Sequence, residues 1–392
     1  MILQSLLALM TLTIFGSCRW EQRTPRALTK NKPPLTVIIP CYNDGESIAD
    51  TIHSLFLCYP HDLLHCIVIN DASTDDSAIQ IANLQTDYPL TVITNETNQG
   101  KVASVNTACK QITTDLVLFL DADVTINPEA IDDMLARLNN PRVGAVSCPY
   151  QPSNDGFWAR MQAIEYDMLR WLQGSYNNVG AISLWGGCHM VKTQALKHVN
   201  YYRPEAITED MDLAFRLTKA GRIVHQSLIP IKTIVPDTFA KRWKQKKRWN
   251  SGGAQCFIIY RRIWIKHPLH LIFMLIFQYI GISRVWGLIQ TMALVTLIHE
   301  FWGLITLLQI SRGTTLLWGG IRFLGSLINK IGFMSFSAPY VWFANRDQGW
   351  KRLLWIIPYT IIYTPLFFWA GWRGLYLGIR VVINEKQGIR GW

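Results

Sequence analysis

Between about residues 31 and 266, short apolar runs alternate with amphipathic stretches. The apolar runs have the length of strands and lie at 35–40, 65–70, 90–94 and 116–120, whereas the stretches at 47–57, 76–86 and 101–112 repeat apolar residues at helical spacing. This alternation predicts an α/β domain built on a mostly parallel, doubly wound sheet. Ligands bind beyond the carboxyl ends of the strands in such sheets, so the residues that follow each apolar run are the first candidates for a site.

Both ends of the chain are more apolar than this central part. Residues 1–18 carry no charge and form a stretch that can just span a bilayer. Basic residues follow between positions 19 and 30, and the positive-inside rule then places the chain beyond them in the cytoplasm. A cleaved signal peptide is the alternative, although such a peptide carries its positive charge before the apolar run. We therefore predict an N-terminal transmembrane anchor and basic linker over 1–30 and a cytoplasmic domain over 31–266.

The C-terminal part, residues 267–392, is predicted to be a membrane region with three or four helices, some of them lying in the interface. Its uncharged runs are 268–283, 285–299, 301–311, 331–345 and 353–372, of which the last is the clearest span. Tryptophans and tyrosines cluster near the ends of these runs, as they do at membrane interfaces. Basic residues after position 372 favour a cytoplasmic C-terminus and an even number of spans in this region.

Composition narrows the class of protein. The 392 residues are 49% hydrophobic and only 17% charged, with 16 Trp and a formal net charge of +11, which suits nucleic acid, anionic lipid or a phosphate-bearing substrate. The eight cysteines are scattered and form no C-x-x-C pair. This spacing favours reduced thiols in a domain that faces the cytosol over a disulfide framework or a zinc site.

Acidic residues follow two of the predicted strands. Asp71 comes directly after the run 65–70, and Asp121 and Asp123 follow the run 116–120. A carboxylate at a strand end can accept hydrogen bonds from a base or ribose, and two carboxylates one residue apart can hold a hard metal ion together with substrate phosphates. A single aspartate in such a place is as well explained by a turn or a helix cap. Two such sites at neighbouring strand ends favour function.

Two further charged clusters lie later in the domain. Glu209, Asp210 and Asp212 precede an amphipathic stretch, where they are explained equally well by a helix cap or by catalysis. Six of the residues 241–248 are basic, which suits either anionic headgroups beside a membrane or a diphosphate. No nucleic-acid-binding module accompanies this basic run, so we predict no nucleic-acid partner.

Taken in order, these motifs resemble those of the processive family-2 glycosyltransferases, which include cellulose, chitin, hyaluronan and poly-N-acetylglucosamine synthases. The similarity covers about 35–265. The local sequences at 140–146 and 249–254 are most similar to those of bacterial poly-β-1,6-N-acetylglucosamine synthases. The motifs that carry it are Pro40-Cys41-Tyr42-Asn43, Asn70 to Asp75, Asn98-Gln99-Gly100-Lys101, Asp121-Ala122-Asp123, Thr208-Glu209-Asp210 and Gln245 to Trp249. The sequence departs from the pattern at Ala72, where a glycine is common.

The resemblance implies a GT-A type nucleotide-sugar-binding domain flanked by transmembrane and interfacial helices. It also implies a role for each matching residue. Pro40, Tyr42, Asp71, Lys101, Asp121 and Arg248 would bind the donor, Asp123 would ligate Mg²⁺ or Mn²⁺, Asp210 would be the general base beside Glu209, and Gln245 and Trp249 would contact the acceptor. The acids Glu209 and Asp212 are expected to raise the pKa of Asp210 by like-charge repulsion.

The implied activity is an inverting, metal-dependent transfer of a sugar, N-acetylglucosamine, from a UDP-sugar to a growing β-linked polysaccharide, with translocation. The resemblance further implies a multi-pass protein of a bacterial-type inner membrane, in contact with the lipid bilayer and a small membrane partner subunit. Within the same chemistry, transfer of one sugar to a lipid acceptor is the alternative. A catalytically silent membrane scaffold and a transporter are the alternatives of another class.

Overall fold

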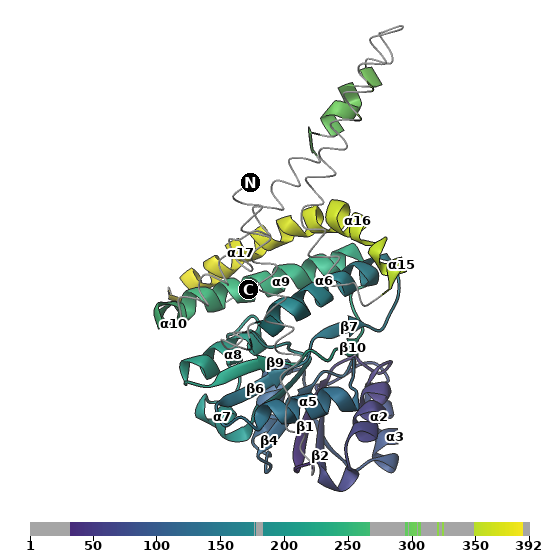
Figure 1. Cartoon of the computed structure of the whole chain (residues 1–392). Helices are drawn as coiled ribbons and strands as arrows, with labels where there is room; N and C mark the ends of the chain where they lie inside the picture. Colours follow the sequence, from purple (N-terminus) through teal and green to yellow (C-terminus); the bar gives the residue numbers. More distant parts are fainter. Residues whose placement is uncertain are drawn as a thin grey trace. The chain divides into compact units, whose positions relative to one another are not determined.

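The computed structural model describes residues 32–175, 177, 183–266 and 349–386, together with isolated helical positions between 295 and 324 (Figure 1). The chain divides into two compact units. The first comprises Met1–Asp237 and Gln255–Ile263, and the second comprises Thr238–Ala254 and Trp264–Trp392. The predicted N-terminal anchor and most of the apolar runs between 267 and 348 lie outside the described residues.

A seven-stranded sheet with the order β3-β2-β1-β4-β8-β6-β9 is the centre of the first unit (Figure 1). Its strands are β1 (Leu35–Cys41), β2 (Leu64–Asn70), β3 (Leu90–Thr94), β4 (Leu116–Leu120), β6 (Val143–Ser147), β8 (Cys188–Lys192) and β9 (Ile223–Gln226). The strands β1 to β4 pair in parallel, and β8 alone runs antiparallel to its neighbours β4 and β6. The predicted α/β class with a mostly parallel sheet is confirmed.

The helices of the first unit alternate with these strands. They are α2 (Ile48–Cys58), α3 (Ser77–Asp87), α4 (Lys101–Cys109), α5 (Pro128–Leu138), α6 (Phe157–Ser175), α7 (Thr193–His198) and α8 (Glu209–Lys219). Local sequence explains where α5 begins: the side chain of Asn127 accepts a hydrogen bond from the backbone N–H of Ala130, and Pro128 follows in the first turn. The three helices expected between the first four strands are present, and α4 ends three residues earlier than its apolar pattern.

Burial of β-branched and leucine side chains holds the sheet together. Every residue of β1 except Pro40 is buried, and the apolar side chains at the centre of β2 are fully inaccessible. The seven described cysteines are buried free thiols, as expected for reduced cysteines. Because Cys41 pairs with Asn70, and Ile38 with Phe119, the carboxyl ends of β1, β2 and β4 meet at one edge of the sheet.

A small second sheet begins shortly after β4 in the sequence. It has the order β5-β10-β7 and consists of β5 (Val124–Thr125), β7 (Tyr150–Pro152) and β10 (Ile231–Thr233). The strand β5 follows directly after Asp123, so its pairing with β10 holds the backbone after the Asp121–Asp123 segment. The strand β7 carries Tyr150, whose hydroxyl accepts a hydrogen bond from the backbone N–H of Gly187.

The second unit contains most of α9 (Phe239–Ile259) and the C-terminal helices α15 (Trp350–Leu353), α16 (Ile356–Pro358) and α17 (Thr364–Lys386), with a π-helical turn at Tyr359–Tyr363. Among the described residues one helical stretch, Leu366–Asn384, is long and apolar enough to cross a membrane, by length and composition only. The run 353–372 was expected to be the clearest span, but it is not one α-helix. Short helices and the π-helical turn occupy its first half, around Pro358, and the apolar helix lies further along the chain.

Candidate active site

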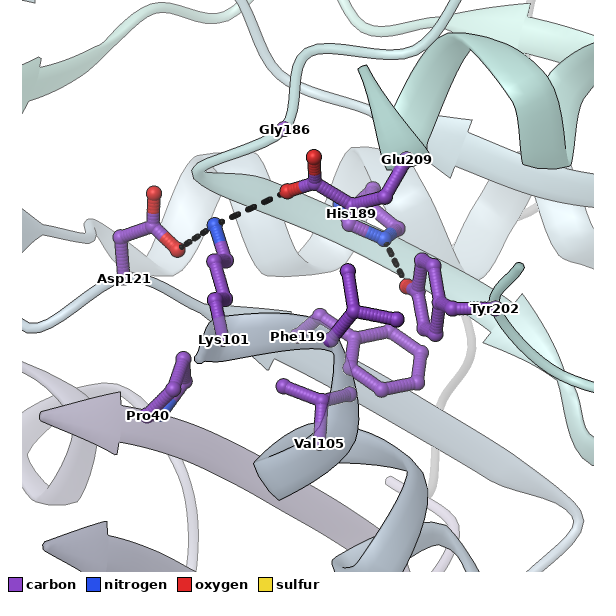
Figure 2. Close-up of a pocket in the computed structure, with 10 residues that line it drawn as sticks. Pro40, Lys101, Val105, Phe119, Asp121, Gly186, His189, Tyr202 and Glu209 are labelled. Carbon is purple, nitrogen blue, oxygen red and sulfur yellow. Dashed lines mark hydrogen bonds and ion pairs between the residues drawn. The ribbon is translucent and has the colours of Figure 1, made fainter. Parts of the chain in front are cut away.

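A pocket of about 300 Å³, counting the solvent in its mouth, lies at the sheet edge where β1 and β4 end (Figure 2). Four parts of the chain form it: the ends of β1 and β4, the start of α4, the segment that leads into β8, and the loop and helix start around α8. The lining residues are Pro40, Lys101, Val102, Val105, Phe119, Asp121, Gly186, His189, Tyr202 and Glu209.

Lys101 is the first residue of α4 and links two acidic motifs across this pocket. Its Nζ lies 2.5 Å from Oδ1 of Asp121 and 3.4 Å from Oε1 of Glu209 (Figure 2). Burial disfavours the ammonium, but the two carboxylates outweigh that effect and raise the pKa of Lys101. Three residues from three separate motifs therefore meet in one charged group, and the lysine keeps its positive charge at neutral pH.

Asp121 and Asp123 lie where a cation would relieve repulsion. Burial, followed by the nearby carboxylates of Asp121 and Asp44, raises the pKa of Asp123 to about 7. No group of three or more His, Cys, Asp or Glu side chains within the described parts of the chain forms a metal cage. Magnesium is commonly bound by one or two carboxylates with substrate phosphates and water completing the shell, and the two aspartates fit a site of that kind.

Asp210 packs directly against the backbone of Gly186. A Cβ atom on Gly186 would lie 2.7 Å from Oδ2 of Asp210, so the absence of a side chain at position 186 gives the carboxylate its place. The other oxygen, Oδ1, accepts a hydrogen bond of 2.8 Å from the backbone N–H of Met211. Asp210 is not itself a lining residue, but it contacts the lining residue Gly186 and is next in sequence to the lining residue Glu209.

The neighbouring backbone is equally close to the other acidic motif. Gly187 accepts a hydrogen bond of 2.8 Å from the backbone N–H of Asp121, and a Cβ atom on Gly187 would lie 3.3 Å from Oδ2 of Asp121. The Gly186–Gly187 pair thus separates Asp121 from Asp210 and sets the position of both.

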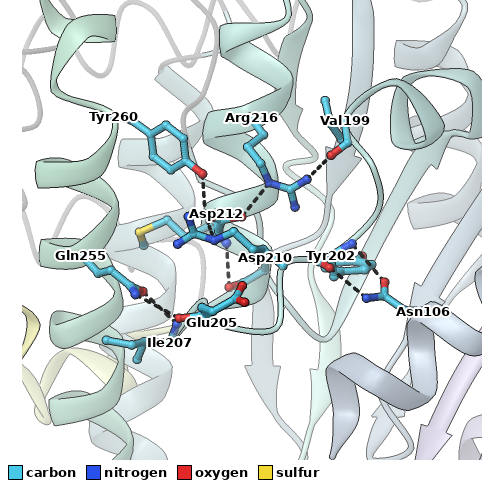
Figure 3. A network of polar contacts seen from close by, with 12 residues as sticks. Asn106, Val199, Tyr202, Glu205, Ile207, Asp210, Asp212, Arg216, Gln255 and Tyr260 are labelled. Carbon is cyan, nitrogen blue, oxygen red and sulfur yellow. Dashed lines mark hydrogen bonds and ion pairs between the residues drawn. The ribbon is translucent and has the colours of Figure 1, made fainter. Parts of the chain in front are cut away.

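Asp212 has a structural role. It is fully buried, with Oδ1 accepting from the Tyr260 hydroxyl at 2.6 Å and Oδ2 accepting from Nε of Arg216 at 2.7 Å (Figure 3). Nε of Arg203 lies 3.6 Å from the same carboxylate. The expectation that Asp212 acts on Asp210 by repulsion does not fit this arrangement, since two arginines balance its charge.

Capping explains little of this acidic cluster. The helix α8 begins at Glu209, and its three acids lie in the first turn, where the helix dipole favours them. Thr208 is the N-cap residue, but its hydroxyl makes no capping hydrogen bond to the described backbone of α8. Glu209 instead points to Lys101.

Asp71 is buried beneath the loop that leads into α4, with 3% of its surface exposed. Its carboxylate accepts hydrogen bonds from the Asn95 amide (2.6 Å) and from the backbone N–H groups of Gln99 (2.9 Å) and Gly100 (2.8 Å). Burial raises the pKa of Asp71, but these hydrogen bonds outweigh it and lower the pKa below its usual value. Asp71 therefore holds the backbone directly before Lys101, and donor binding by its carboxylate stays a prediction.

The remaining residues of the first unit that are predicted to bind the sugar donor, Pro40 and Tyr42, lie at the carboxyl end of β1. Pro40 lines the pocket, and Tyr42 is exposed over 47% of its surface. Asn43 and Ala72 have positive φ angles, 57° each. Two hydrogen bonds join their loops: the backbone N–H of Asn43 donates to the Ser73 hydroxyl, and the backbone N–H of Thr74 donates to Oδ1 of Asn43.

Sequence reasoning missed the aromatic floor of the pocket. The His189 ring stacks on Phe119 with centroids 5.1 Å apart, and its Nε2 lies 2.5 Å from the Tyr202 hydroxyl (Figure 2). Burial and the positive charge of Lys101 lower the pKa of His189 to about 4, so the ring is neutral near pH 7. The available signal was Gly186–Gly187 before a strand, since adjacent glycines there indicate close backbone approach.

The remaining predicted residues, Gln245, Arg248 and Trp249, lie on α9 in the second unit. Arg248 is exposed, whereas Gln245 and Trp249 are partly buried. Contact of these side chains with the diphosphate and the acceptor stays a prediction.

A family model and curated relatives that are similar to this chain both point to glycosyltransferases. The family model "Glycosyl transferase family 2" matches residues 36–199. The chain is 31% identical over 255 residues to the poly-β-1,6-N-acetyl-D-glucosamine synthase of Staphylococcus epidermidis (strain RP62A), covering 63% of this chain and 61% of that protein. It is 29% identical over 229 residues to the synthase of the same name from Staphylococcus aureus (strain COL), covering 57% and 55%. The match thus spans little more than half the length of these relatives.

The fold has a counterpart among solved structures. The mannosyltransferase PcManGT from Pyrobaculum calidifontis, solved in complex with GDP-Man and Mn²⁺, superposes with a TM-score of 0.56 and 16% identity, covering 99% of this chain and 100% of that chain. A likeness at this identity concerns the fold alone. It agrees with the predicted GT-A architecture.

Proposed function

We propose that this chain, a family-2 glycosyltransferase, transfers N-acetylglucosamine from a UDP-sugar donor to a growing β-linked polysaccharide. The observation that carries the proposal is the meeting of Lys101, Asp121, Glu209 and the Gly186–Asp210 contact at one pocket. A scaffold that had only retained the fold would have no need to keep four charged groups from three separate motifs together at one sheet edge.

The acceptor side of the reaction falls to Asp210. Its carboxylate, which contacts Gly186 of the pocket lining, takes the proton from the acceptor hydroxyl as that oxygen forms a bond to the anomeric carbon of the donor sugar. The bond between the anomeric carbon and the diphosphate oxygen breaks, and its electron pair leaves with UDP. Attack from the face opposite the leaving group inverts the anomeric centre and gives a β-linkage.

The donor side falls to the residues around Lys101. Asp123 and Asp121 are the residues that would hold Mg²⁺ or Mn²⁺, which when bound supplies charge neutralisation for the leaving diphosphate. Lys101 keeps Asp121 in place and adds positive charge where the diphosphate develops negative charge. Arg248 supplies a second cation, and Gln245 and Trp249 hold the acceptor end, with the Trp249 ring offering a flat face to a sugar.

The choice of N-acetylglucosamine and of a polymer is supported by the names of the relatives at 29% and 31% identity. The proposal also places the chain in a bacterial-type inner membrane as a multi-pass protein, with its catalytic domain in the cytoplasm and a small membrane subunit as partner. Support comes from the uncharged residues 1–18, the basic residues after them and the apolar helix stretch Leu366–Asn384.

Incubation of membranes that contain the full chain with a panel of radiolabelled nucleotide sugars tests the proposal. We expect label from UDP-N-acetylglucosamine to enter a ladder of long chains, with no incorporation after chelation of divalent ions and recovery on adding Mg²⁺ or Mn²⁺. A single labelled glycolipid would support the alternative, transfer to a lipid acceptor. Absence of incorporation from every donor would refute the proposal.

A further inference from the structure

Arg242 lies on α9 in the second unit and is the largest fully buried side chain among the described residues. It stands one helical turn before Gln245 and two turns before Trp249, so all three face a similar direction on the helix. Burial of an arginine is costly unless its N–H groups are paired, so the contacts of this side chain indicate what it does.

Those contacts include both predicted acceptor residues. The Nη1 group of Arg242 donates a hydrogen bond to Oε1 of Gln245, and the centre of its guanidinium lies 5.1 Å from the centroid of the Trp249 ring. At that distance a guanidinium attracts the face of an indole ring. A single buried cation therefore sets the side-chain positions of Gln245 and Trp249 together.

A different nitrogen of the Arg242 guanidinium bonds to the C-terminal part of the chain. Its Nε donates a hydrogen bond of 2.8 Å to the hydroxyl of Tyr363. Tyr363 ends the π-helical turn Tyr359–Tyr363, and its ring stacks on Tyr359 with centroids 5.3 Å apart. Turns of this kind occur often at functional sites because they change the direction in which a side chain points.

Close backbone packing supports the same link. A Cβ atom on Gly374 of α17 would lie 2.6 Å from the carbonyl oxygen of Lys247, and one on Gly378 would lie 2.7 Å from Cβ of Ala254. Small residues four positions apart let two helices approach closely. Helix α17 thus packs tightly against the helix that carries Gln245 and Trp249, and Arg242 adds a polar bond to this contact.

We propose that Arg242 is a positioning residue that orients Gln245 and Trp249 for the acceptor and ties both to Tyr363 of the C-terminal segment. The inference rests on the proposed function, because acceptor binding by Gln245 and Trp249 belongs to that function. Arg242 itself touches neither donor nor acceptor in this proposed role.

The test uses the full chain in membranes or detergent, with radiolabelled UDP-N-acetylglucosamine and a short N-acetylglucosamine oligosaccharide as acceptor. Arg242→Lys keeps the charge but loses the planar fork that reaches Tyr363 and Gln245 at once. Tyr363→Phe keeps the ring and removes one hydrogen bond. We expect Arg242→Lys to raise the KM for the acceptor about tenfold and Tyr363→Phe to raise it about threefold, with the donor KM within twofold of the wild type.

The matched control is Arg137→Lys. Arg137 is a buried arginine of α5 in the first unit, where its Nε pairs with Asp133 at 2.8 Å. Loss of that pairing is expected to lower the melting temperature without a selective change in the acceptor KM. Should Arg242→Lys fail to fold, Tyr363→Phe carries the test alone.

Two results would overturn the inference: an unchanged acceptor KM in Tyr363→Phe and in a folded Arg242→Lys, or donor and acceptor KM values that rise by the same factor. A parallel Trp249→Ala variant separates this failure from failure of the proposed function. Loss of transfer in Trp249→Ala with unchanged Arg242 and Tyr363 variants refutes only the positioning role. Full activity in Trp249→Ala refutes the acceptor role on which the inference stands.

Discussion

Gly186 and Asp210 are in such close contact that a methyl group at position 186 would lie 2.7 Å from Oδ2 of the aspartate. The two residues come from different parts of the chain, since Gly186 precedes β8 and Asp210 is the second residue of α8. A small change in the backbone before β8 therefore changes the position of the proposed general base directly.

The substitution Gly186→Ala tests this contact. The added methyl group has to displace Asp210 or the backbone beneath it, because real Cβ atoms do not approach a heavy atom so closely. We expect kcat to fall about 100-fold, within the range that a placed base contributes, while the donor dissociation constant changes less than threefold.

Gly144→Ala is its matched control. A Cβ atom there would lie 2.9 Å from Cβ of Arg222, an intrusion of similar size in β6 outside the pocket lining. It is expected to lower stability without the selective loss of kcat. Equal kcat values for the two glycine variants would contradict the role given to Gly186.

Lys101 provides a test of donor binding. Lys101→Met removes the charge that lies 2.5 Å from Asp121 and leaves two carboxylates, Asp121 and Glu209, without their shared cation. The donor KM should rise about 100-fold, as expected when one charged hydrogen-bond partner is lost. Lys32→Met, which removes a lysine near Asp132 on another part of the surface, should leave the donor KM unchanged. A donor KM for Lys101→Met within twofold of the wild type would exclude this residue from the site.

Asp71 is expected to matter for stability, and its effect should depend on pH. Asp71→Asn places an N–H group against the donors of Asn95, Gln99 and Gly100, and we expect a loss of about 2–3 kcal/mol in the free energy of unfolding near pH 7. Since the folded-state pKa of Asp71 is lowered, its contribution is present above the unfolded pKa of about 4 and is lost as the pH falls through the folded pKa.

Thermal unfolding of wild type and Asp71→Asn between pH 7 and pH 3 measures this directly. The gap between the two melting temperatures should narrow as the pH falls. Asp155→Asn is the control, because its ion pair with Arg160 is exposed and such pairs contribute little to stability. A gap that is constant across the pH range would show that the Asp71 carboxylate is not the group responsible.

Replacement of Ala72 by glycine is expected to stabilise the protein, because this residue has a positive φ angle. Its φ of 57° lies in the left-handed region, which costs a residue with a Cβ about 1–2 kcal/mol and costs glycine almost nothing. After the greater entropy of glycine in the unfolded chain is subtracted, Ala72→Gly should raise the free energy of unfolding by about 0.5–1 kcal/mol. A lower melting temperature for Ala72→Gly would contradict the strain assigned to this turn.

The local pattern of apolar and polar residues was sufficient to predict the first four strands of the large sheet. The strands β1 to β4 begin and end within one residue of their apolar runs, because burial on both faces of a parallel sheet demands continuous apolar segments. The rule that ligands bind at the carboxyl ends of strands also pointed to Asp121, which lines the pocket, whereas Lys101 and Pro40 were expected there only from the family resemblance.

Other features of the site depend on contacts between distant parts of the chain, which the local sequence does not reveal. Asp212 has the same local setting as Asp210. Its pairing with Arg216, four residues later on α8, follows a local spacing, but Arg203 and Tyr260 lie outside α8 and no local pattern reports them. His189 lies on the one antiparallel strand of the large sheet, whose insertion between β4 and β6 is a long-range pairing that apolar spacing does not encode. The surroundings of Asp212 and His189 therefore depend on contacts from distant parts of the chain.

The most direct test compares donor binding and turnover in Asp123→Ala and Asp210→Asn, in the presence of Mn²⁺. If one pocket serves a metal-bound donor and a separate base, Asp123→Ala should lose turnover and bind the labelled UDP-sugar much more weakly, whereas Asp210→Asn should lose turnover and bind it as the wild type does. Equal loss of donor binding in both variants, or full turnover in Asp210→Asn, would contradict the account.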